Sequence, residues 1–395
     1  MSNLSISQRV KHIKPSPTLA VTARAAELKA AGKDIIGLGA GEPDFDTPDH
    51  IKAAAIAAIN SGFTKYTAVD GTPELKSAII KKFARDNTLS YEPHQILVSC
   101  GGKHSFYNLC QALLNPDDEV IIPAPYWVSY PPMVELAGGK PVIVQGSMQN
   151  NFKITTDQLR KSITAKTRML VINSPSNPTG AVYTTEELIS IAHILKQYPN
   201  ILVVTDDIYE AIVLEGNPFQ NILTVAPELF AQTIVLNGVS KAYSMTGWRI
   251  GYAAGPAPLI KAMKTIQSQS TSNPSSISQV AAQRALEGDQ SFIQTMLDAF
   301  RARHTFVHQR LNEINGIECK PAHGAFYLFP CIENAIKQKN LKDDIEFGEW
   351  LLENAGIAMV PGSAFGSPGF MRLSFATSLE KLTEAMNRLE KALTR

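Results

Sequence analysis

A lysine placed between a strand-like run and an arginine is the strongest chemical signal in this sequence. The apolar run Ile234–Leu236 leads into a polar turn that ends at Lys241, and Arg249 follows eight residues later. A lysine fixed at a strand end and partly removed from water loses its proton more readily, so it can attack a carbonyl and form a Schiff base. A guanidinium nearby suits a phosphate, because it binds anionic oxygens in pairs. Together these residues predict a lysine that holds pyridoxal 5'-phosphate.

Three polar residues that follow other apolar runs fit the same cofactor. Asp206 ends the run Ile201–Thr205, where a carboxylate can pair with a protonated pyridine nitrogen and keep the ring an electron sink. Tyr209 and Asn177 can bind the ring hydroxyl. Each has a plainer interpretation: Asp206 as a helix or turn cap, Tyr209 as a packing residue, and Asn177 as part of the turn before Pro178.

Three further positions have the residue types that a phosphate, a ring and a carboxylate need. The Gly101-Gly102 pair stands between a strand and a helix, which frees backbone amides for a phosphate, although a plain turn is the alternative. The P-loop pattern GxxxxGK[ST] is absent. Trp127 can stack on a cofactor or pack in a core. Arg372 lies inside an apolar run, so it needs a partner carboxylate or a ligand carboxylate.

Alternating short apolar runs and longer helical segments from residue 95 to 254 predict an α/β fold with a largely parallel sheet. In such sheets ligands bind beyond the carboxyl ends of the strands, where the residues above stand. After residue 255 long helices and then mixed strands predict a smaller α+β domain. The predicted divisions are an N-terminal segment at 1–48 that joins the small domain, a large cofactor-binding domain at 49–295, and the small domain at 296–395.

Composition and charge exclude several classes of function. The chain has 395 residues and a formal net charge of +1, which argues against general attraction to nucleic acid or membrane. It has no apolar run of 18 residues and no signal-like N-terminus, so we expect a cytoplasmic protein. The cysteines and histidines lack metal-ligand spacing, so no metal is expected. A GxGxG string at 37–41 is not followed by a long helix, which disfavours a dinucleotide site.

Taken together, the motifs resemble those of the class I (fold type I) pyridoxal-phosphate-dependent aminotransferases. The similarity extends over nearly the whole chain, and the order of the motifs is very specific. The matching segments are AGEPDFDTP (40–48), TKY (64–66), GGK (101–103), PAPYWVSYP (123–131), NSPSNPTGAVY (173–183), DDIYE (206–210), NGVSKAYSMTGWRIGYA (237–253), GAFY (324–327) and RLSFATS (372–378). Within the family, the chain is most similar to bacterial aspartate aminotransferases, including those that also accept prephenate.

The resemblance implies a role for each site residue. The implied cofactor contacts are Lys241 as Schiff-base lysine and proton shuttle, Asp206 at the pyridine nitrogen, Asn177 and Tyr209 at the ring oxygen, Arg249 with the Gly102 and Lys103 amides at the phosphate, and Trp127 stacked on the ring. Tyr66 is implied to reach the phosphate of the neighbouring subunit, which implies a homodimer with shared active sites.

The resemblance also implies how the substrate is bound. Gly41, Trp127 and Asn177 are implied to contact the substrate, and Arg372 to grip its α-carboxylate. The implied distal-carboxylate contacts are Lys103, Ser16 and Thr18, and Lys14 matches a position associated with prephenate use. His104 stands where the family commonly has Gln or Glu, which leaves the side-chain preference open.

The expected activity is transfer of the amino group of L-aspartate to 2-oxoglutarate, giving oxaloacetate and L-glutamate, with prephenate to arogenate as an additional reaction. Alternatives within the cofactor class are an aminotransferase of aromatic or alanine type, a β-lyase or a decarboxylase. A regulatory protein built on the same fold is a different class, but such proteins normally carry an added DNA-binding domain. The enzyme-like pattern begins here by residue 15, with no basic helical arm.

Overall fold

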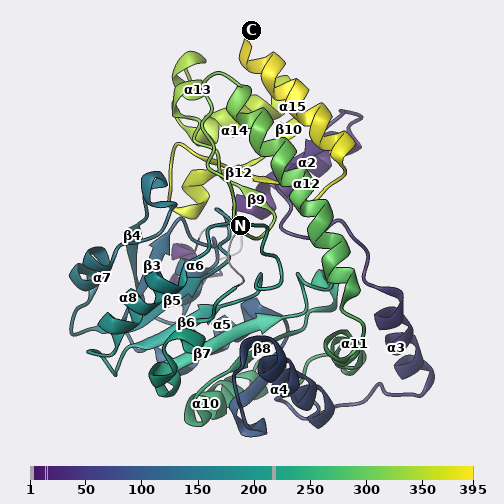
Figure 1. The fold of residues 1–395 in the computed structure, drawn as a ribbon, viewed down its shortest axis with the longest axis vertical. Helices are drawn as coiled ribbons and strands as arrows, with labels where there is room; N and C mark the ends of the chain where they lie inside the picture. The colour runs from purple at the N-terminus through teal and green to yellow at the C-terminus, as the bar shows by residue number, and fades with distance from the viewer. Residues whose placement is uncertain (1–3, 14, 16, 216–218, 395) are drawn as a thin grey trace.

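The computed structural model describes residues 4–13, 15, 17–215 and 219–394. A seven-stranded sheet lies in the larger part of the chain, and a smaller layer of short strands and helices sits above the carboxyl ends of its strands (Figure 1). Among the described residues, no helix is long and apolar enough to span a bilayer.

The large sheet is parallel except for one strand. In sheet order its strands are β2 (Ile96–Ser99), β8 (Gly251–Ala254), β7 (Thr233–Gly238), β6 (Leu202–Asp206), β5 (Thr167–Asn173), β3 (Glu119–Ala124) and β4 (Lys140–Gln145). Only β8 is antiparallel to its neighbours. The predicted α/β fold with a mostly parallel sheet is therefore confirmed. The strand predicted to begin at Arg249 begins instead at Gly251, because Arg249 occupies a left-handed turn (φ 57°).

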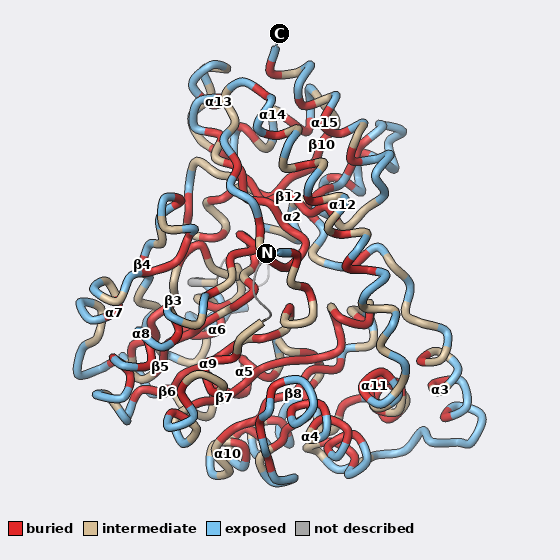
Figure 2. The backbone as a smooth tube through the Cα atoms, in the orientation of Figure 1, coloured by how far each residue is buried: buried red, intermediate tan, exposed pale blue. Residues whose placement is uncertain are grey.

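Helices cover both faces of this sheet because its side chains alternate between the faces. On one face, Val120 and Ile122 pack in a cluster with residues of α5, α6 and α10. On the other, Ile121 packs in a cluster with residues of α4, α8 and α11. Figure 2 shows the resulting run of buried backbone through the strands.

The smaller part has two short sheets. A parallel pair joins β1 (Ile36–Gly37) to β10 (Ile357–Ala358), and an antiparallel sheet has the order β11 (Val360–Pro361), β12 (Met371–Ser374), β9 (Tyr327–Leu328). The run 357–361, predicted as one strand, is split in two, because its halves pair with different partners. Apolar residues of β1, β9, β10 and β12 pack with α12, α14 and α15 in one cluster, while Val360 of β11 packs in a separate one.

The α-helices are α1 (Gln8–His12), α2 (Pro17–Ala30), α3 (Asp49–Asn60), α4 (Pro73–Asn87), α5 (Gly102–Leu113), α6 (Tyr130–Leu136), α7 (Thr156–Ser162), α8 (Thr185–Leu195), α9 (Ile222–Val225), α10 (Ala257–Ser268), α11 (Ser276–Glu287), α12 (Ser291–Glu313), α13 (Glu333–Gln338), α14 (Asp344–Ala355) and α15 (Leu379–Thr394). Among the described residues, the 3₁₀ turns are η1 (Pro93–Gln95), η2 (Met148–Asn150), η3 (Pro227–Gln232), η4 (Thr246–Trp248) and η5 (Gly362–Phe365). Helix α10 was not predicted from the sequence.

The domain boundaries 1–48, 49–295 and 296–395 stay a proposal. Pairing of β1 with β10 supports placing the N-terminal segment with the small domain. Residue 295 lies within α12, which runs from the large part to the small part in Figure 1. Residues of α12 pack mainly in the cluster of the small part, so the proposed boundary falls near the start of a helix that joins the two.

Candidate active site

A cavity of about 390 Å³ lies where the carboxyl ends of β5, β6 and β7 face the smaller part of the chain. Most of the side chains that the sequence predicts for the site line it. These are Thr18, Gly41, Gly102, Lys103, Trp127, Asn177, Asp206, Tyr209, Lys241, Arg249 and Arg372. Parallel strands end at one edge of a sheet, so residues far apart in the sequence meet there.

Lys241 projects into the cavity from the turn that follows β7. Its amine donates to the backbone oxygen of Gly41 at 2.5 Å. Burial lowers the pKa of Lys241 to about 8, because an ammonium is disfavoured away from water; the Glu42 carboxylate opposes the shift and Arg372 adds to it. With this pKa about one-tenth of the amine is neutral at pH 7, far more than for an ordinary lysine, and the neutral form is the one a nucleophile and proton carrier requires.

Asp206 ends β6 and faces the same cavity. The Tyr130 hydroxyl donates to its Oδ2 at 2.5 Å, and the Ile208 amide donates to its Oδ1 at 3.3 Å. Burial raises the pKa of Asp206, while the Tyr130 hydrogen bond is the strongest influence that lowers it. Asn173 donates to the backbone oxygen of Asp206 at 3.0 Å, which fixes the end of β6 against the end of β5.

Tyr209 and Asn177 lie on the side of the cavity nearest the small part. The hydroxyls of Tyr209 and Tyr327 are 2.8 Å apart. Asn177 accepts a hydrogen bond from Arg372 through Oδ1 at 2.9 Å. That bond leaves the Asn177 amide nitrogen as the group that can donate to a ligand oxygen.

Arg372 is buried without a carboxylate partner among the described residues. Its Nη2 donates to the backbone oxygen of Gly39 at 2.6 Å, and its guanidinium lies 4.6 Å from the Tyr327 ring centroid and 5.0 Å from that of Phe365. Its Nε is buried and unpaired. Burial lowers its pKa. Of the two interpretations open from the sequence, a ligand carboxylate therefore has structural support, since no protein carboxylate pairs with Arg372 in the described ranges.

The opposite end of the cavity has the donors and the space that a phosphate needs. A Cβ at Gly101, whose φ is 89°, would collide with the Arg249 guanidinium, and one at Gly251 would collide with the Gly102 amide. In the part of the chain that the structure describes, no backbone acceptor is found for the Gly102 and Lys103 amides at the start of α5. Helix-start amides beside a guanidinium form an anion site. This donor set fits the phosphate of the predicted cofactor.

The rim of the cavity carries the residues predicted for the distal carboxylate. The Lys103 amine lies 5.2 Å from the centre of the Trp127 ring, and burial lowers its pKa, with a smaller contribution from Arg249. Thr18 contributes a buried, unpaired hydroxyl from α2. Ser16 and Lys14 lie outside the described residues.

Tyr66 does not line this cavity, and 92 % of it is exposed. Its predicted contact is with a neighbouring subunit, which a single chain does not test.

Several cavity residues were not assigned a role from the sequence. Tyr130, Ser240 and Tyr327 line the cavity. Ser240 directly precedes Lys241, and this adjacency is the sequence signal that could have found it. Nothing in the local sequence links Tyr130 to Asp206, because the two residues are 76 positions apart.

Known proteins are similar over the full length. Residues 33–389 match the family model described as "Aminotransferase class I and II". The chain is 59% identical to an aspartate/prephenate aminotransferase of Nitrosomonas europaea, covering 99% of this chain and 100% of the relative. It is 52% identical to an aspartate aminotransferase of Geobacillus stearothermophilus, covering 98% of each.

Solved structures are similar in fold over the same length. The crystal structure of the aspartate aminotransferase from Rhizobium meliloti has a TM-score of 0.96 at 46% identity, covering 100% of both chains. The aspartate aminotransferase from Thermus thermophilus with maleate has a TM-score of 0.93 at 43% identity, covering 98% of this chain and 100% of that one.

Proposed function

This chain belongs to the class I and II aminotransferases, and on that premise we propose that it transfers the amino group of L-aspartate to 2-oxoglutarate. It is a pyridoxal-phosphate-dependent transaminase of fold type I. The observation that carries the substrate proposal is buried Arg372, which lines the Lys241 cavity and has no carboxylate partner among the described residues. An amino or 2-oxo acid supplies the missing carboxylate.

A dicarboxylic substrate is supported by the rim and by the relatives. Lys103 adds a second cationic side chain to the cavity that Arg372 lines, and Thr18 adds a hydroxyl that is unpaired among the described residues. Related enzymes are named aspartate aminotransferases, and one was crystallised with maleate, a dicarboxylate. Prephenate as an additional acceptor of the amino group is supported by the names of two relatives, at 59% and 54% identity.

We propose that each site residue has one task. When bound, the cofactor withdraws electrons from the substrate Cα and stores the amino group between the two half-reactions. The Lys241 amine would hold the cofactor until the substrate amine released it, and would then move the proton from the substrate Cα to the C4' carbon of the cofactor. Asp206 supplies a negative charge for the pyridine nitrogen, and Asn177 and Tyr209 bind the ring oxygen.

The residues around the phosphate and around the substrate carboxylate also have one task each in this proposal. Arg249 and the amides of Gly102 and Lys103 hold the phosphate, and Trp127 covers one face of the ring. Arg372 orients the substrate through its α-carboxylate, while Gly41 and Asn177 contact the substrate beside it. These contacts fix the direction of the Cα–H bond relative to the ring and to Lys241.

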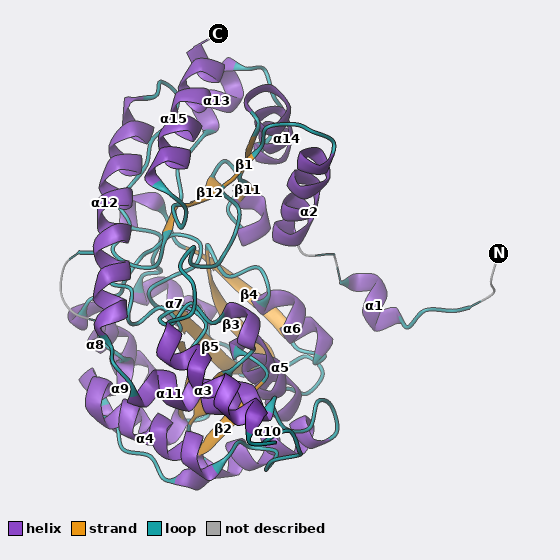
Figure 3. Cartoon of the chain, turned by 90° about the vertical axis from the view of Figure 1, so that its right-hand side faces the viewer, coloured by secondary structure: helices purple, strands orange, loops and turns teal. Residues whose placement is uncertain are grey.

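A homodimer with shared active sites belongs to the same proposal. Large apolar side chains are exposed along α3 and the loop after it: Ile56, Ile59, Phe63 and Tyr66. Helix α1 projects away from the rest of the chain (Figure 3). A second copy covering these surfaces would remove apolar area from water, and it would bring Tyr66 to the phosphate of the neighbouring site. A cytoplasmic location is also proposed, and cell fractionation tests it.

The experiment that tests the activity follows both half-reactions. Purified protein should show cofactor absorbance that changes when L-aspartate is added and returns when 2-oxoglutarate follows, with one glutamate formed for each oxaloacetate. Glutamate formation that is not stoichiometric would point to a lyase or decarboxylase. Absorbance that does not respond to any amino donor would support a binding protein instead. Arogenate formation from prephenate and aspartate tests the additional reaction.

A further inference from the structure

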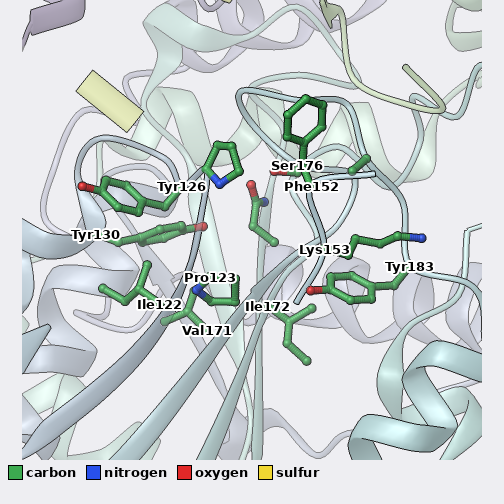
Figure 4. Close-up of a pocket in the computed structure, with 13 residues that line it drawn as sticks. Ile122, Pro123, Tyr126, Tyr130, Phe152, Lys153, Val171, Ile172, Ser176 and Tyr183 are labelled. Carbon is green, nitrogen blue, oxygen red and sulfur yellow. The ribbon is translucent and has the colours of Figure 1, made fainter. Parts of the chain in front are cut away.

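Tyr130 separates the active-site cavity from a second, smaller cavity behind it. It is the first residue of α6, only 1% of it is exposed, and it lines both spaces. The second cavity has a volume of about 30 Å³. Figure 4 shows the Tyr130 and Tyr183 hydroxyls both pointing into it, while the Tyr126 hydroxyl and the Lys153 amine point away.

The Tyr130 hydroxyl is the one side chain that donates to the Asp206 carboxylate among the described residues. It donates to Oδ2 at 2.5 Å, and the only other donor is the Ile208 amide, at a longer 3.3 Å from Oδ1. A phenol hydroxyl that donates to an ionised carboxylate makes a charge-assisted hydrogen bond, which is stronger than one between neutral groups. The bond occupies one carboxylate oxygen and thereby limits rotation of the group.

The charge on Asp206 depends on this contact. Burial disfavours the ionised carboxylate and raises its pKa, and the Tyr130 hydrogen bond is the largest influence in the other direction. Tyr130 keeps its own proton, because burial and the Asp206 charge raise the phenol pKa well above its ordinary value. It is therefore the donor in the hydrogen bond to Asp206.

Packing leaves Tyr130 little freedom to move away. Its ring lies 4.9 Å from that of Phe106 and 5.2 Å from that of Trp127, measured between centroids. Its amide donates to the backbone oxygen of Trp127 at 3.0 Å. One short turn therefore carries both the indole proposed to cover the ring and the phenol that contacts Asp206.

The second cavity limits how much hydrogen bonding to Asp206 is lost when the Tyr130 hydroxyl is removed. Its wall includes the apolar side chains of Ile122, Val171 and Ile172. A space of about 30 Å³ can admit a water molecule. A water molecule that entered there would restore part of the hydrogen bonding to Asp206, but it would not hold the carboxylate in one orientation as the packed Tyr130 ring does.

We propose that Tyr130 is a positioning residue that keeps the Asp206 carboxylate ionised and aimed at the pyridine nitrogen of the bound cofactor. The proposal rests on the proposed role of Asp206 in a transaminase. Tyr130 therefore has two roles in this proposal: it packs in the core, and it positions the carboxylate that serves the cofactor.

The test uses the holoenzyme with Tyr130→Phe and Tyr126→Phe as a matched control, since the Tyr126 hydroxyl points away from the second cavity in Figure 4 and Tyr126 does not line the active-site cavity. Each protein is loaded with pyridoxal phosphate labelled with nitrogen-15, and the chemical shift of the ring nitrogen is recorded. In Tyr130→Phe the shift should move toward that of an unprotonated pyridine. With aspartate and 2-oxoglutarate, kcat should fall about tenfold with KM nearly unchanged. Tyr126→Phe should match the wild type in both measurements.

A second variant guards against loss of folding in Tyr130→Phe. 3-Fluorotyrosine at position 130 keeps the ring and the hydroxyl but is a stronger donor, so the ring-nitrogen shift should stay at the protonated value of the wild type or move further toward it. If the ring nitrogen is protonated in the wild type and its shift is unchanged in both variants, the role of Tyr130 is overturned while that of Asp206 stands. An unprotonated nitrogen in the wild type would overturn the role of Asp206 together with it. Neither shift requires a substrate, so a wrong substrate assignment is distinguished from both.

Discussion

Arg372 and Asn177, 195 positions apart in the sequence, are joined by a hydrogen bond of 2.9 Å from the guanidinium Nη1 to the side-chain oxygen. The bond connects β12 of the smaller part to the loop that follows β5 of the large sheet. It leaves the Arg372 Nε without a partner among the described residues. It also occupies the oxygen of the Asn177 amide and leaves its nitrogen as the donor. The cavity around Lys241 is thus lined from both parts of the chain.

Replacement of Arg372 with lysine should weaken substrate binding specifically. Lysine keeps the charge but loses the planar fork that binds a carboxylate in pairs. KM for aspartate should rise by about 10- to 100-fold, as expected for the loss of a charge-assisted hydrogen bond, while the cofactor absorbance stays unchanged. Arg310→Lys is the control, because Arg310 pairs with Glu390 on the surface. An unchanged KM in Arg372→Lys would exclude Arg372 from carboxylate recognition.

Lys241→Ala should abolish turnover. The variant removes the group proposed to hold the cofactor and to carry the Cα proton, so kcat should fall by at least ~100-fold. Steady-state glutamate formation measures the loss, and Lys261→Ala, at an exposed position on α10, is the control. Near-native turnover in Lys241→Ala would show that another base does this work.

The sequence predicted the parts of the site that stand at strand ends. Asp206 and Lys241 follow buried apolar runs whose order along the chain indicates a parallel sheet, and that topology alone brings their side chains to one edge. Contacts across long separations were not predictable in this way. The bond from Arg372 to Gly39 spans 333 positions, and that from Tyr130 to Asp206 depends on how α6 packs. Local patterns contain no information on such packing.

Lys103→Met should discriminate between substrates by their distal group. Methionine keeps much of the side-chain length but removes the charge proposed to meet the distal carboxylate. For aspartate, kcat/KM should fall by about tenfold or more, while that for phenylalanine should change little. Kinetic measurements with both donors check this, and Lys140→Met, at an exposed position on β4, is the control. Equal losses for both donors would indicate that Lys103 serves the cofactor rather than the distal carboxylate.

Burial of His304 in its neutral form should make the protein less stable in mild acid than at neutral pH. The buried ring accepts a hydrogen bond from the Ala322 amide at 3.0 Å, and burial, with His308 nearby, lowers its pKa from 6.5 to about 4. The unfolded chain therefore takes up the proton first, and stability falls as pH drops from 6.5 toward 4, by about 3 kcal/mol in total. Denaturant unfolding of His304→Gln should show a smaller loss over this range. His193→Gln, an exposed control, should retain the wild-type dependence.

Tyr66 should act in the active site of the neighbouring subunit, and mixed dimers test this directly. If Tyr66 of one chain reaches the phosphate bound by the other, Tyr66→Ala and Lys241→Ala homodimers should both be impaired. In a dimer with one chain of each kind, the chain that carries Tyr66→Ala keeps Lys241 and receives an intact Tyr66 from its neighbour, so one complete site forms. Unfolding and refolding the two variants together should restore activity to about a quarter of the wild-type value, because half of the dimers are mixed and each has one such site. If Tyr66 served its own chain instead, no mixed dimer would contain a complete site, and mixing would restore nothing.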